Sequence, residues 1–328
     1  MDRIVTNSRV LVTGGAGFIG SNLVESLLKT GNYVVCLDNF STGKRENLSG
    51  FINNPHFRLI EGDIRNYSDC EESVRGIDYV FHEAALGSVP RSISDPVSST
   101  DVNIGGFVKM LFAAKEAKVR RFIYAASSST YGDHQGLPKV EETIGKPLSP
   151  YGITKFADEL FADNFSAIYK IDVIGLRYFN VFGRRQDPLG AYAAVIPLFV
   201  TRLFRHDPPV INGNGMYSRD FTYIDNVVQA NHLAALVQER EAVNQVYNVA
   251  HGERTNLNEL FDLIRQLTGR YDPAILQIQP VYGPERAGDI PHSLASIEKA
   301  VRLLGYSPTH NVRQGMEEAV EWYRANLL

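Results

Sequence analysis

Short apolar runs alternate with longer amphipathic stretches through the first half of the chain. Runs rich in β-branched and aromatic residues predict strands at 9–13, 33–37, 57–60, 78–82, 121–126 and 172–177. Between the first two, Leu23, Val24, Leu27 and Leu28 recur on one face of a helix predicted over 21–29. Such alternation is typical of parallel strands joined by helical crossovers, so we expect an α/β fold with a doubly wound, mostly parallel sheet.

The alternation weakens after about residue 180. Loops rich in proline, glycine and arginine are predicted at 183–190, 206–219 and 282–292. A helix is predicted over 256–267, because Asn256 and Glu259 have the spacing of a capping box and Gly269 can end the helix. We therefore expect a smaller α/β lobe over 181–328, packed against a first domain over 1–180 with some interleaved segments.

Composition narrows the classes of function. The 33 basic and 37 acidic residues give a net charge of −4, which argues against a nucleic-acid partner. Two cysteines, Cys36 and Cys70, are too few for a disulfide framework or a four-cysteine zinc site, and we expect no metal. The longest apolar runs are about half of the ~20 residues that cross a bilayer, and residues 1–8 do not resemble a signal peptide. We expect no membrane partner and a cytoplasmic location.

A glycine-rich turn follows the first predicted strand. Gly14, Gly17 and Gly20 have the spacing G-x-x-G-x-x-G and lead into a helix, an arrangement that brings backbone amides against a pyrophosphate. Asp38, at the end of the second strand, is placed to bind ribose hydroxyls, and its charge disfavours the 2′-phosphate of NADP. We expect NAD, with NADP left as an alternative by nearby Lys44 and Arg45.

A tyrosine and a lysine lie four residues apart in Tyr151-Gly152-Ile153-Thr154-Lys155, on one face of a predicted helix. A phenol ordinarily titrates near pH 10, and an adjacent ammonium favours the phenolate and its use as a general base. The strand that precedes this helix ends in Ser127-Ser128-Ser129, where a hydroxyl can share a proton with the same substrate oxygen.

These motifs, in this order, resemble the extended short-chain dehydrogenase/reductase family, whose domain is of the Rossmann type. Within that family, residues 82–92, 127–134, 176–188 and 191–197 resemble bacterial UDP-N-acetylglucosamine 4-epimerases, and the similarity spans nearly the whole chain. The resemblance implies an NAD-binding domain, a UDP-sugar-binding lobe, and a homodimer formed through a helical bundle that includes the Tyr-Lys helix.

The resemblance also implies roles for individual residues. Tyr151 is expected to be the base, Lys155 to lower the phenol pKa and hold the nicotinamide ribose, and Ser127 to assist. Cofactor contacts are expected at Gly14, Gly17, Phe18, Ile19, Gly20, Asp38, Asn39, Phe40, Ser41, Gly43, Asp63, Ile64, Ala84, Ala85, Asn103, Tyr151, Lys155 and Tyr178. Substrate contacts are expected at Gly87, Ser88, Ser127, Ser129, Tyr151, Asn180, Ala194, Val195, Arg219, Arg286, Asp289 and Ser293, with the arginines on the pyrophosphate.

The activity implied is inversion of C4 in a UDP-N-acetylhexosamine through a transient 4-keto sugar. Ser293 is small where relatives restricted to UDP-glucose carry a tyrosine, which leaves room for an acetamido group; hexose and uronic-acid substrates stay open, since Arg91 could bind a carboxylate. A dehydratase or decarboxylase is the first alternative, although residues 128–130 lack the acid such relatives carry. A non-catalytic NAD sensor is the second, although sensors commonly lose the Tyr-Lys pair.

Overall fold

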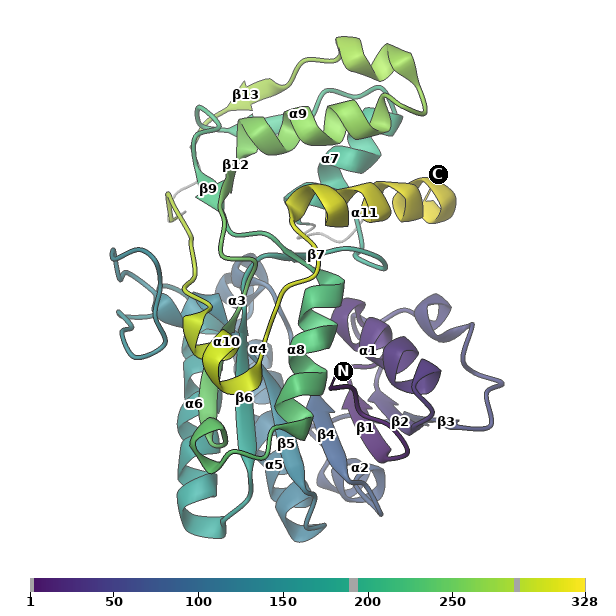
Figure 1. Cartoon of the computed structure of the whole chain (residues 1–328), viewed down its shortest axis with the longest axis vertical. Coiled ribbons are helices and arrows are strands. Elements are labelled where there is room, and N and C mark those ends of the chain that lie inside the picture. The colour runs from purple at the N-terminus through teal and green to yellow at the C-terminus, as the bar shows by residue number, and fades with distance from the viewer. Residues whose placement is uncertain (1–2, 189–193, 286–289, 328) are drawn as a thin grey trace.

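The computed structural model describes residues 3–188, 194–285 and 290–327. It has a layered lower part built around one large sheet and an upper part of helices and short strand pairs (Figure 1). Among the described residues, no helix is both long enough and apolar enough to cross a membrane.

The large sheet has seven strands in the order β11-β6-β5-β4-β1-β2-β3, and all neighbouring pairs are parallel. Its strands are β1 (Arg9–Thr13), β2 (Tyr33–Asp38), β3 (Phe57–Glu61), β4 (Tyr79–His82), β5 (Arg121–Ser127), β6 (Val173–Tyr178) and β11 (Gln245–Val249). The predicted doubly wound α/β fold is confirmed, and the six predicted strands agree to within one residue at each end. The seventh strand, β11, was not predicted.

Helices cover both faces of the sheet, which is why its strands are apolar on both sides. Along β1, Val10 and Val12 join the core under α1 (Phe18–Lys29) and α8 (Ile224–Leu236), whereas Leu11 joins the opposite core. That opposite core is closed by α2 (Tyr67–Ser73), α5 (Phe107–Glu116) and α6 (Pro150–Tyr169). The short helices α3 (Val89–Ser94) and α4 (Pro96–Thr100) contact α6.

The upper part is built around α7 (Val195–Phe204), α9 (Leu257–Thr268) and α11 (Val312–Leu327). Its paired strands are short: β7 (Val181–Phe182) with β10 (Thr222–Tyr223), β8 (Val210–Asn212) with β13 (Val281–Gly283), and β9 (Ser218–Arg219) with β12 (Thr255–Asn256). The predicted capping box of α9 is present, since Asn256 accepts from Glu259 N at 2.9 Å and Glu259 accepts from Asn256 N at 2.9 Å. Gly269 follows as the C-cap.

Three segments from the second half of the chain belong to the lower part: α8, β11 and α10 (Glu298–Leu304). β11 pairs with β6, and α10 contacts β11 and α8. The division of the chain at residue 180 stays a prediction, and these are its interleaved segments.

Candidate active site

A cavity of about 630 Å³ lies at the carboxyl ends of the central strands. This position is where doubly wound sheets bind their ligands. Twenty-one of the residues predicted from the sequence to contact cofactor or substrate line it: Gly14, Gly17, Phe18, Ile19, Gly20, Asp38, Asn39, Ser41, Gly43, Asp63, Ile64, Ala84, Ala85, Gly87, Ser88, Ser127, Tyr151, Lys155, Tyr178, Asn180 and Ala194. We call it the first cavity.

The glycine turn between β1 and α1 leaves no space for a Cβ at Gly14 or Gly20. A Cβ on Gly14, which has φ +66°, would lie 2.8 Å from the Ala84 backbone, and a Cβ on Gly20 would lie 2.2 Å from the Gly14 carbonyl oxygen. Gly17 is the N-cap of α1 and has no side chain to cap the first amides. The positive end of this 12-residue helix therefore points its backbone donors at the first cavity, as a pyrophosphate site requires.

Asp38 fixes the loop that follows β2. Its two carboxylate oxygens accept hydrogen bonds from Ala16 N and Phe40 N, both at 2.8 Å, and burial raises its pKa despite these bonds. A carboxylate has about four acceptor positions, so ribose hydroxyls can still bind. Lys44 pairs with Asp187 at 3.0 Å and Arg45 pairs with Glu61 through two bonds, which commits both cations to protein acids and favours NAD over NADP.

Asp63 and Ile64 line the far end of the first cavity, after β3. Asn39 Nδ2 donates to Asp63 Oδ2 at 2.8 Å, which joins the ends of β2 and β3. The Arg65 guanidinium bound to Asp63 is the main reason that the pKa of this carboxyl falls to about 2. Asp63 is therefore ionised at neutral pH, and its contact with the adenine end of the cofactor stays a prediction.

Tyr151 and Lys155 enter the cavity from the first turns of α6. Ser149 caps this helix by accepting from Gly152 N at 3.1 Å, and Tyr151 N donates to the Ser92 hydroxyl of α3 at 3.0 Å. These bonds fix the helix start, so the backbone of Tyr151 has a defined place above the strand ends.

The Lys155 ammonium is buried and held at two points. It donates to Ala125 O at 2.9 Å and to Asp158 Oδ2 at 3.2 Å. Burial acts to lower its pKa, but Asp158 and Tyr151 act more strongly together and raise it. Lys155 therefore carries its charge at neutral pH and can stabilise a neighbouring phenolate. The second oxygen of Asp158 has no hydrogen-bond partner among the described residues.

Ser127, the third residue predicted to be catalytic, lies at the end of β5. Its hydroxyl accepts from Ser129 N at 3.1 Å, and its neighbour on β6 is Tyr178. Below it, the buried Arg177 and Glu159 form a two-point ion pair at 2.9 and 2.7 Å that ties β6 to α6. This pair holds the helix of Tyr151 against the strand of Ser127.

Glu83, which directly follows β4, also lines the cavity. The Tyr178 hydroxyl donates to Glu83 Oε1 at 2.8 Å, and Asn231 Nδ2 donates to the Tyr178 oxygen at 2.9 Å. Burial raises the pKa of Glu83 to about 7, although the bond from Tyr178 and the charge of Lys155 act in the opposite direction.

A second cavity of about 300 Å³ adjoins the first and shares Asn180, Val181, Gln186 and Ala194 with it. Two further predicted residues, Val195 and Arg219, line this second cavity. Its other walls are mostly apolar and come from β7, α7, β8, the start of α9 and the segments around β9 and β13: Phe182, Ile196, Leu198, Phe199, Val210, Asn212, Tyr217, Phe221, Leu257 and Glu285. The site is therefore a deep cleft at the sheet with an apolar extension in the upper part.

Four predicted residues line neither cavity. Asn103 sits in a π-helical turn (Asp101–Gly106), where its amide bonds Leu86 N at 2.8 Å and Thr154 Oγ1 at 3.0 Å, so it supports the loop after β4. Phe40 packs under Arg45, and Ser129 presents its amide to Ser127. Ser293 donates its backbone N–H to Ser218 O at 3.0 Å. Arg286 and Asp289 lie outside the described residues.

The sequence reasoning assigned no role to several residues that line the first cavity: Thr42, Asn47, Glu83, Leu86, Val89, Arg185, Gln186 and Asp187. Most follow a strand or lie next to a predicted residue. A rule that takes every residue in the first few positions after a parallel strand would have found Glu83 and Leu86.

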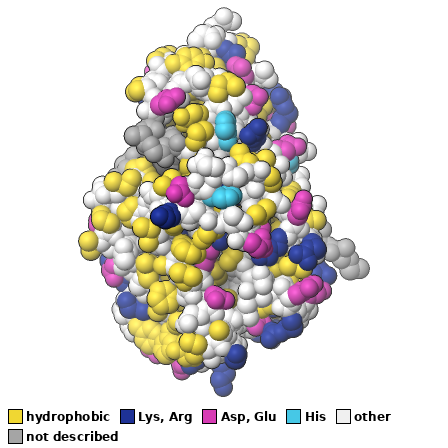
Figure 2. All heavy atoms as spheres, turned by 90° about the vertical axis from the view of Figure 1, so that its left-hand side faces the viewer, with side chains coloured by type: hydrophobic (Ala, Val, Ile, Leu, Met, Phe, Trp, Pro, Cys, Tyr) yellow, Lys and Arg dark blue, Asp and Glu magenta, His cyan; other side chains and the backbone are white. Residues whose placement is uncertain are grey.

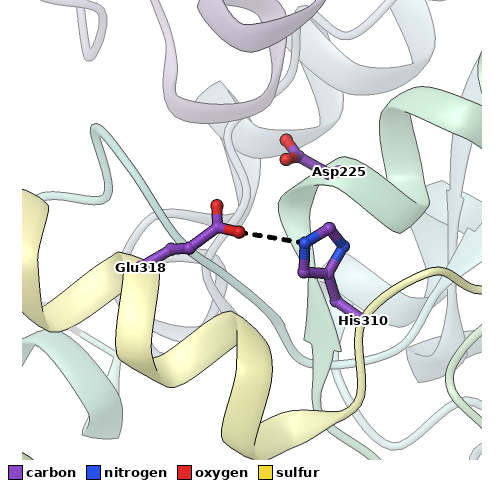
Figure 3. A group of neighbouring side chains, drawn as sticks. All are labelled: Asp225, His310 and Glu318. Atoms are coloured by element: carbon purple, nitrogen blue, oxygen red, sulfur yellow. Dashed lines mark hydrogen bonds and ion pairs between the residues drawn. The ribbon is translucent and has the colours of Figure 1, made fainter.

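One further group of polar side chains lies outside both cavities. Asp225, His310 and Glu318 hold ligand atoms within 4.8 Å of one another (Figure 3). The Arg184 guanidinium already pairs with both acids, at 2.7 Å to Asp225 and 3.6 Å to Glu318. We interpret the group as an ion-pair network that joins α8 and α11 to the loop after β7.

A doubly wound sheet with a glycine turn, a serine and a Tyr-Lys pair at its strand ends defines a class of dinucleotide-dependent enzymes. The chain matches the model of the NAD dependent epimerase/dehydratase family over residues 10–250. It therefore belongs to this family, as the sequence motifs predicted, and NAD is its cofactor.

Three solved structures show how close the likeness is. A UDP-N-acetylglucosamine 4-epimerase from Methanobrevibacter ruminantium M1, in complex with UDP-N-acetylmuramic acid, is 37% identical with a TM-score of 0.91, over 98% of this chain and 99% of that one. A UDP-glucose 4-epimerase from Thermotoga maritima with UDP-glucose is 37% identical, TM-score 0.89, over 98% and 100%. One from Thermus thermophilus with NAD is 32% identical, TM-score 0.85, over 97% and 99%. The chain is an enzyme of the UDP-sugar epimerase family.

Proposed function

We propose that the enzyme inverts C4 of UDP-N-acetylglucosamine and UDP-N-acetylgalactosamine. The observation that carries this proposal is the first cavity, where Ser127, Tyr151 and Lys155 line the same space as the glycine turn. A sugar held between the two cavities would meet an acid/base group and the cofactor together.

NAD, when bound, supplies the acceptor that takes a hydride from C4 and returns it to the other face. The side chains manage the proton. Tyr151 removes the proton of the C4 hydroxyl, Ser127 bonds the same oxygen, and the Lys155 ammonium stabilises the phenolate. After the keto sugar has rotated to present its other face to the cofactor, Tyr151 returns the proton to the C4 oxygen. Positioning of this kind requires the rigid helix start and strand end described above.

The second cavity suits the uridine diphosphate. Asn180 stands where the two cavities meet, and the Arg219 guanidinium donates to Ser218 O at 3.0 Å and Pro291 O at 3.2 Å, which orients it along the wall. A guanidinium presents paired donors that match phosphate oxygens. Arg286 and Asp289, outside the described residues, stay predicted contacts of the same ligand.

Room for the acetamido group is supported by the small residues Gly87 and Ala194 in the wall of the first cavity. A Cβ on Gly87 would meet nothing within 4 Å. Support from Ser293 is weaker, because its side chain lines neither cavity among the described residues. The acetamido preference is thus proposed from the cavity wall and from the likeness to an N-acetylglucosamine epimerase.

The test is incubation of the pure protein with UDP-GlcNAc, UDP-GalNAc, UDP-Glc, UDP-Gal and the uronic-acid forms, with products read by NMR. We expect interconversion of the two N-acetylated sugars with the highest kcat/KM. Faster turnover of the hexoses or the uronates would show that the proposed substrate is wrong. A 4-keto-6-deoxy product would show dehydration instead of epimerisation, and a pentose product would show decarboxylation.

Ser293→Tyr sharpens the same test. If Ser293 faces the sugar, kcat/KM should fall for the N-acetylated pair and be spared for the hexose pair, because a filled pocket excludes the larger group by overlap. If kcat/KM of Ser293→Tyr equals that of the parent on all four sugars, Ser293 does not face the sugar. Equal losses on both pairs would indicate damage to its bond with Ser218.

The partner proposed is a second copy of the chain. Ile153, Leu160 and Ile168 form an exposed apolar stripe along α6, and Val97 of neighbouring α4 is 77% exposed. Figure 2 views the molecule from the left-hand side of Figure 1, where α6 lies in the lower part, and hydrophobic side chains gather on the lower part of that view. Paired α6 helices would bury the stripe, as the predicted helical bundle requires.

Sedimentation of the parent should show a dimer. The dimer should be lost in Leu160→Glu and kept in Ile52→Glu, a control at a position that is 50% exposed and lies outside α6.

A further inference from the structure

Four acidic side chains line the first cavity: Asp38, Asp63, Glu83 and Asp187. Asp38 and Asp63 follow β2 and β3 at the adenine end, and Asp187 pairs with Lys44. Glu83 alone follows a central strand, β4, whose neighbour β5 ends at Ser127. It precedes Ala84 and Ala85, which line the same wall. A carboxyl group therefore stands beside the catalytic group with no role in the proton transfer.

The groups around Glu83 come from four elements. Lys155 and Tyr151 belong to α6, and Lys155 is already bound to Asp158 and Ala125 O. Tyr178 of β6 donates to the Glu83 carboxyl, with Asn231 of α8 behind it. His82 of β4 bonds Thr13, and burial lowers its pKa to about 3, so it is neutral. Among these described neighbours, Lys155 is the one cation that faces Glu83, and its charge is shared between Glu83 and Asp158.

We propose that the Glu83 carboxylate sets the redox poise of the bound nicotinamide by stabilising its positively charged oxidised ring. Tyr151 must reach the sugar hydroxyl on the carbon that gives up the hydride, so the ring lies in the part of the cavity where Glu83 stands. A nearby negative charge favours the cationic ring over the neutral reduced ring. No proton has to move at Glu83, because the sugar proton goes to Tyr151. The carboxylate thereby opposes accumulation of enzyme with reduced cofactor.

This inference rests on the proposed function only in that turnover passes through hydride transfer. Its first test measures the ratio of reduced to oxidised cofactor by absorbance at 340 nm in holoenzyme equilibrated with UDP-GlcNAc at pH 8.5. Glu83→Gln should raise the ratio about tenfold, which is about 30 mV for a two-electron couple. Asp187→Asn is the matched control, because Asp187 lines the same cavity but is paired with Lys44 and does not follow a central strand. Its ratio should stay within about twofold of the parent.

The pH dependence gives an independent readout. Below pH 6 the Glu83 carboxyl of the parent is protonated, so the parent should approach the Glu83→Gln ratio; above pH 8 the difference should be full. Tyr178→Phe removes a hydrogen bond that favours the carboxylate. The ratio in Glu83→Gln serves as the reference at each pH, because proton transfer to Tyr151 is common to all the proteins. The pH at which the parent ratio departs from this reference should move upward in Tyr178→Phe.

A second measurement does not depend on the sugar. Sodium cyanoborohydride reduces the bound oxidised cofactor directly, and the rise at 340 nm should be about threefold or more faster in Glu83→Gln than in the parent and in Asp187→Asn. Equal rates and equal ratios in Glu83→Gln and the parent would overturn the proposal, as would equal effects of the two variants. If no UDP-sugar reduces any of the proteins while the cyanoborohydride difference persists, the substrate assignment fails and the role of Glu83 stands.

Discussion

The two cavities are built in different ways. The first lies at the ends of parallel strands of five to seven residues, apart from β4, and its chemical groups sit at strand ends and helix starts. The second is walled by segments held in strand pairs of two or three residues, drawn from positions 180 to 285. The chemical groups of the first cavity therefore follow from local sequence patterns. The shape of the second cavity follows from contacts between segments that are distant in the sequence.

The largest expected effect tests the first cavity as the place of chemistry. Tyr151→Phe should lower kcat by about 10²–10⁴-fold with little change in UDP-sugar binding, because it removes the acid/base oxygen and leaves the ring. Steady-state kinetics and binding calorimetry measure the two quantities. Tyr169→Phe, at the exposed end of the same helix, is the control and should keep full activity. Activity of Tyr151→Phe within tenfold of the parent would move the base elsewhere.

A substitution in the second cavity should change substrate binding and leave the chemical step nearly unchanged. Arg219→Lys keeps the charge but loses the paired donors, so KM should rise roughly 10–100-fold while kcat changes little. Arg254→Lys, at an exposed position, is the matched control. A fall in kcat with unchanged KM would contradict the separation of the two cavities.

The glycine turn offers an intermediate effect confined to the cofactor. In Gly20→Ala the new methyl would come 2.2 Å from the Gly14 carbonyl oxygen, so the turn must shift. We expect the NAD content of the purified protein to fall about tenfold, at the scale of overpacking costs. Gly50→Ala meets nothing within 4 Å and should retain its NAD, measured after denaturation. An unchanged NAD content in Gly20→Ala would show that the pyrophosphate lies elsewhere.

The smallest effect concerns stability and leaves turnover at neutral pH unchanged. His232 on α8 accepts from Val5 N at 3.1 Å, and burial lowers its pKa to about 4. Because the folded pKa lies below the unfolded value, the stabilisation is present above about pH 6.5 and is lost as the pH falls toward 4.

Between pH 7.5 and pH 5, urea unfolding should show a loss of unfolding free energy that is about 2 kcal/mol smaller in His232→Asn than in the parent, since buried His82 contributes equally to both proteins. His206, exposed after α7 in the upper part, is the control, and His206→Asn should keep the loss. An equal loss in both variants would place the acid sensitivity outside the contact between α8 and the N-terminal segment.

The same contrast explains what could be predicted from the sequence. Strands of the sheet are periodic and apolar on both faces, and the glycine turn and the Tyr-Lys pair need only local spacing, so these features were predictable residue by residue. β11 was missed because Gln245–Val249 is short and lies where the alternation is weak. Asn103 stays a predicted cofactor contact; a π-helical turn directs its amide to Leu86 and Thr154, and no sequence pattern signals that turn.

Residues of the second cavity were predictable only through family likeness. Asn180, Val195 and Arg219 come together because two-residue strand pairs join distant segments. Ser293 lies near them in the fold, through its bond to Ser218 O, yet its side chain is not in the cavity wall. Small differences in loop path of this kind carry no signature in composition or periodicity.

The pairing of β11 with β6 also limits how this protein can be cut. A fragment ending near residue 180 would lack α8 and β11, so β6 would become an open sheet edge and one apolar face would lose its cover. A segment that ends near residue 180 is thus not a transplantable module, and a chain truncated anywhere before residue 249 lacks part of the sheet itself.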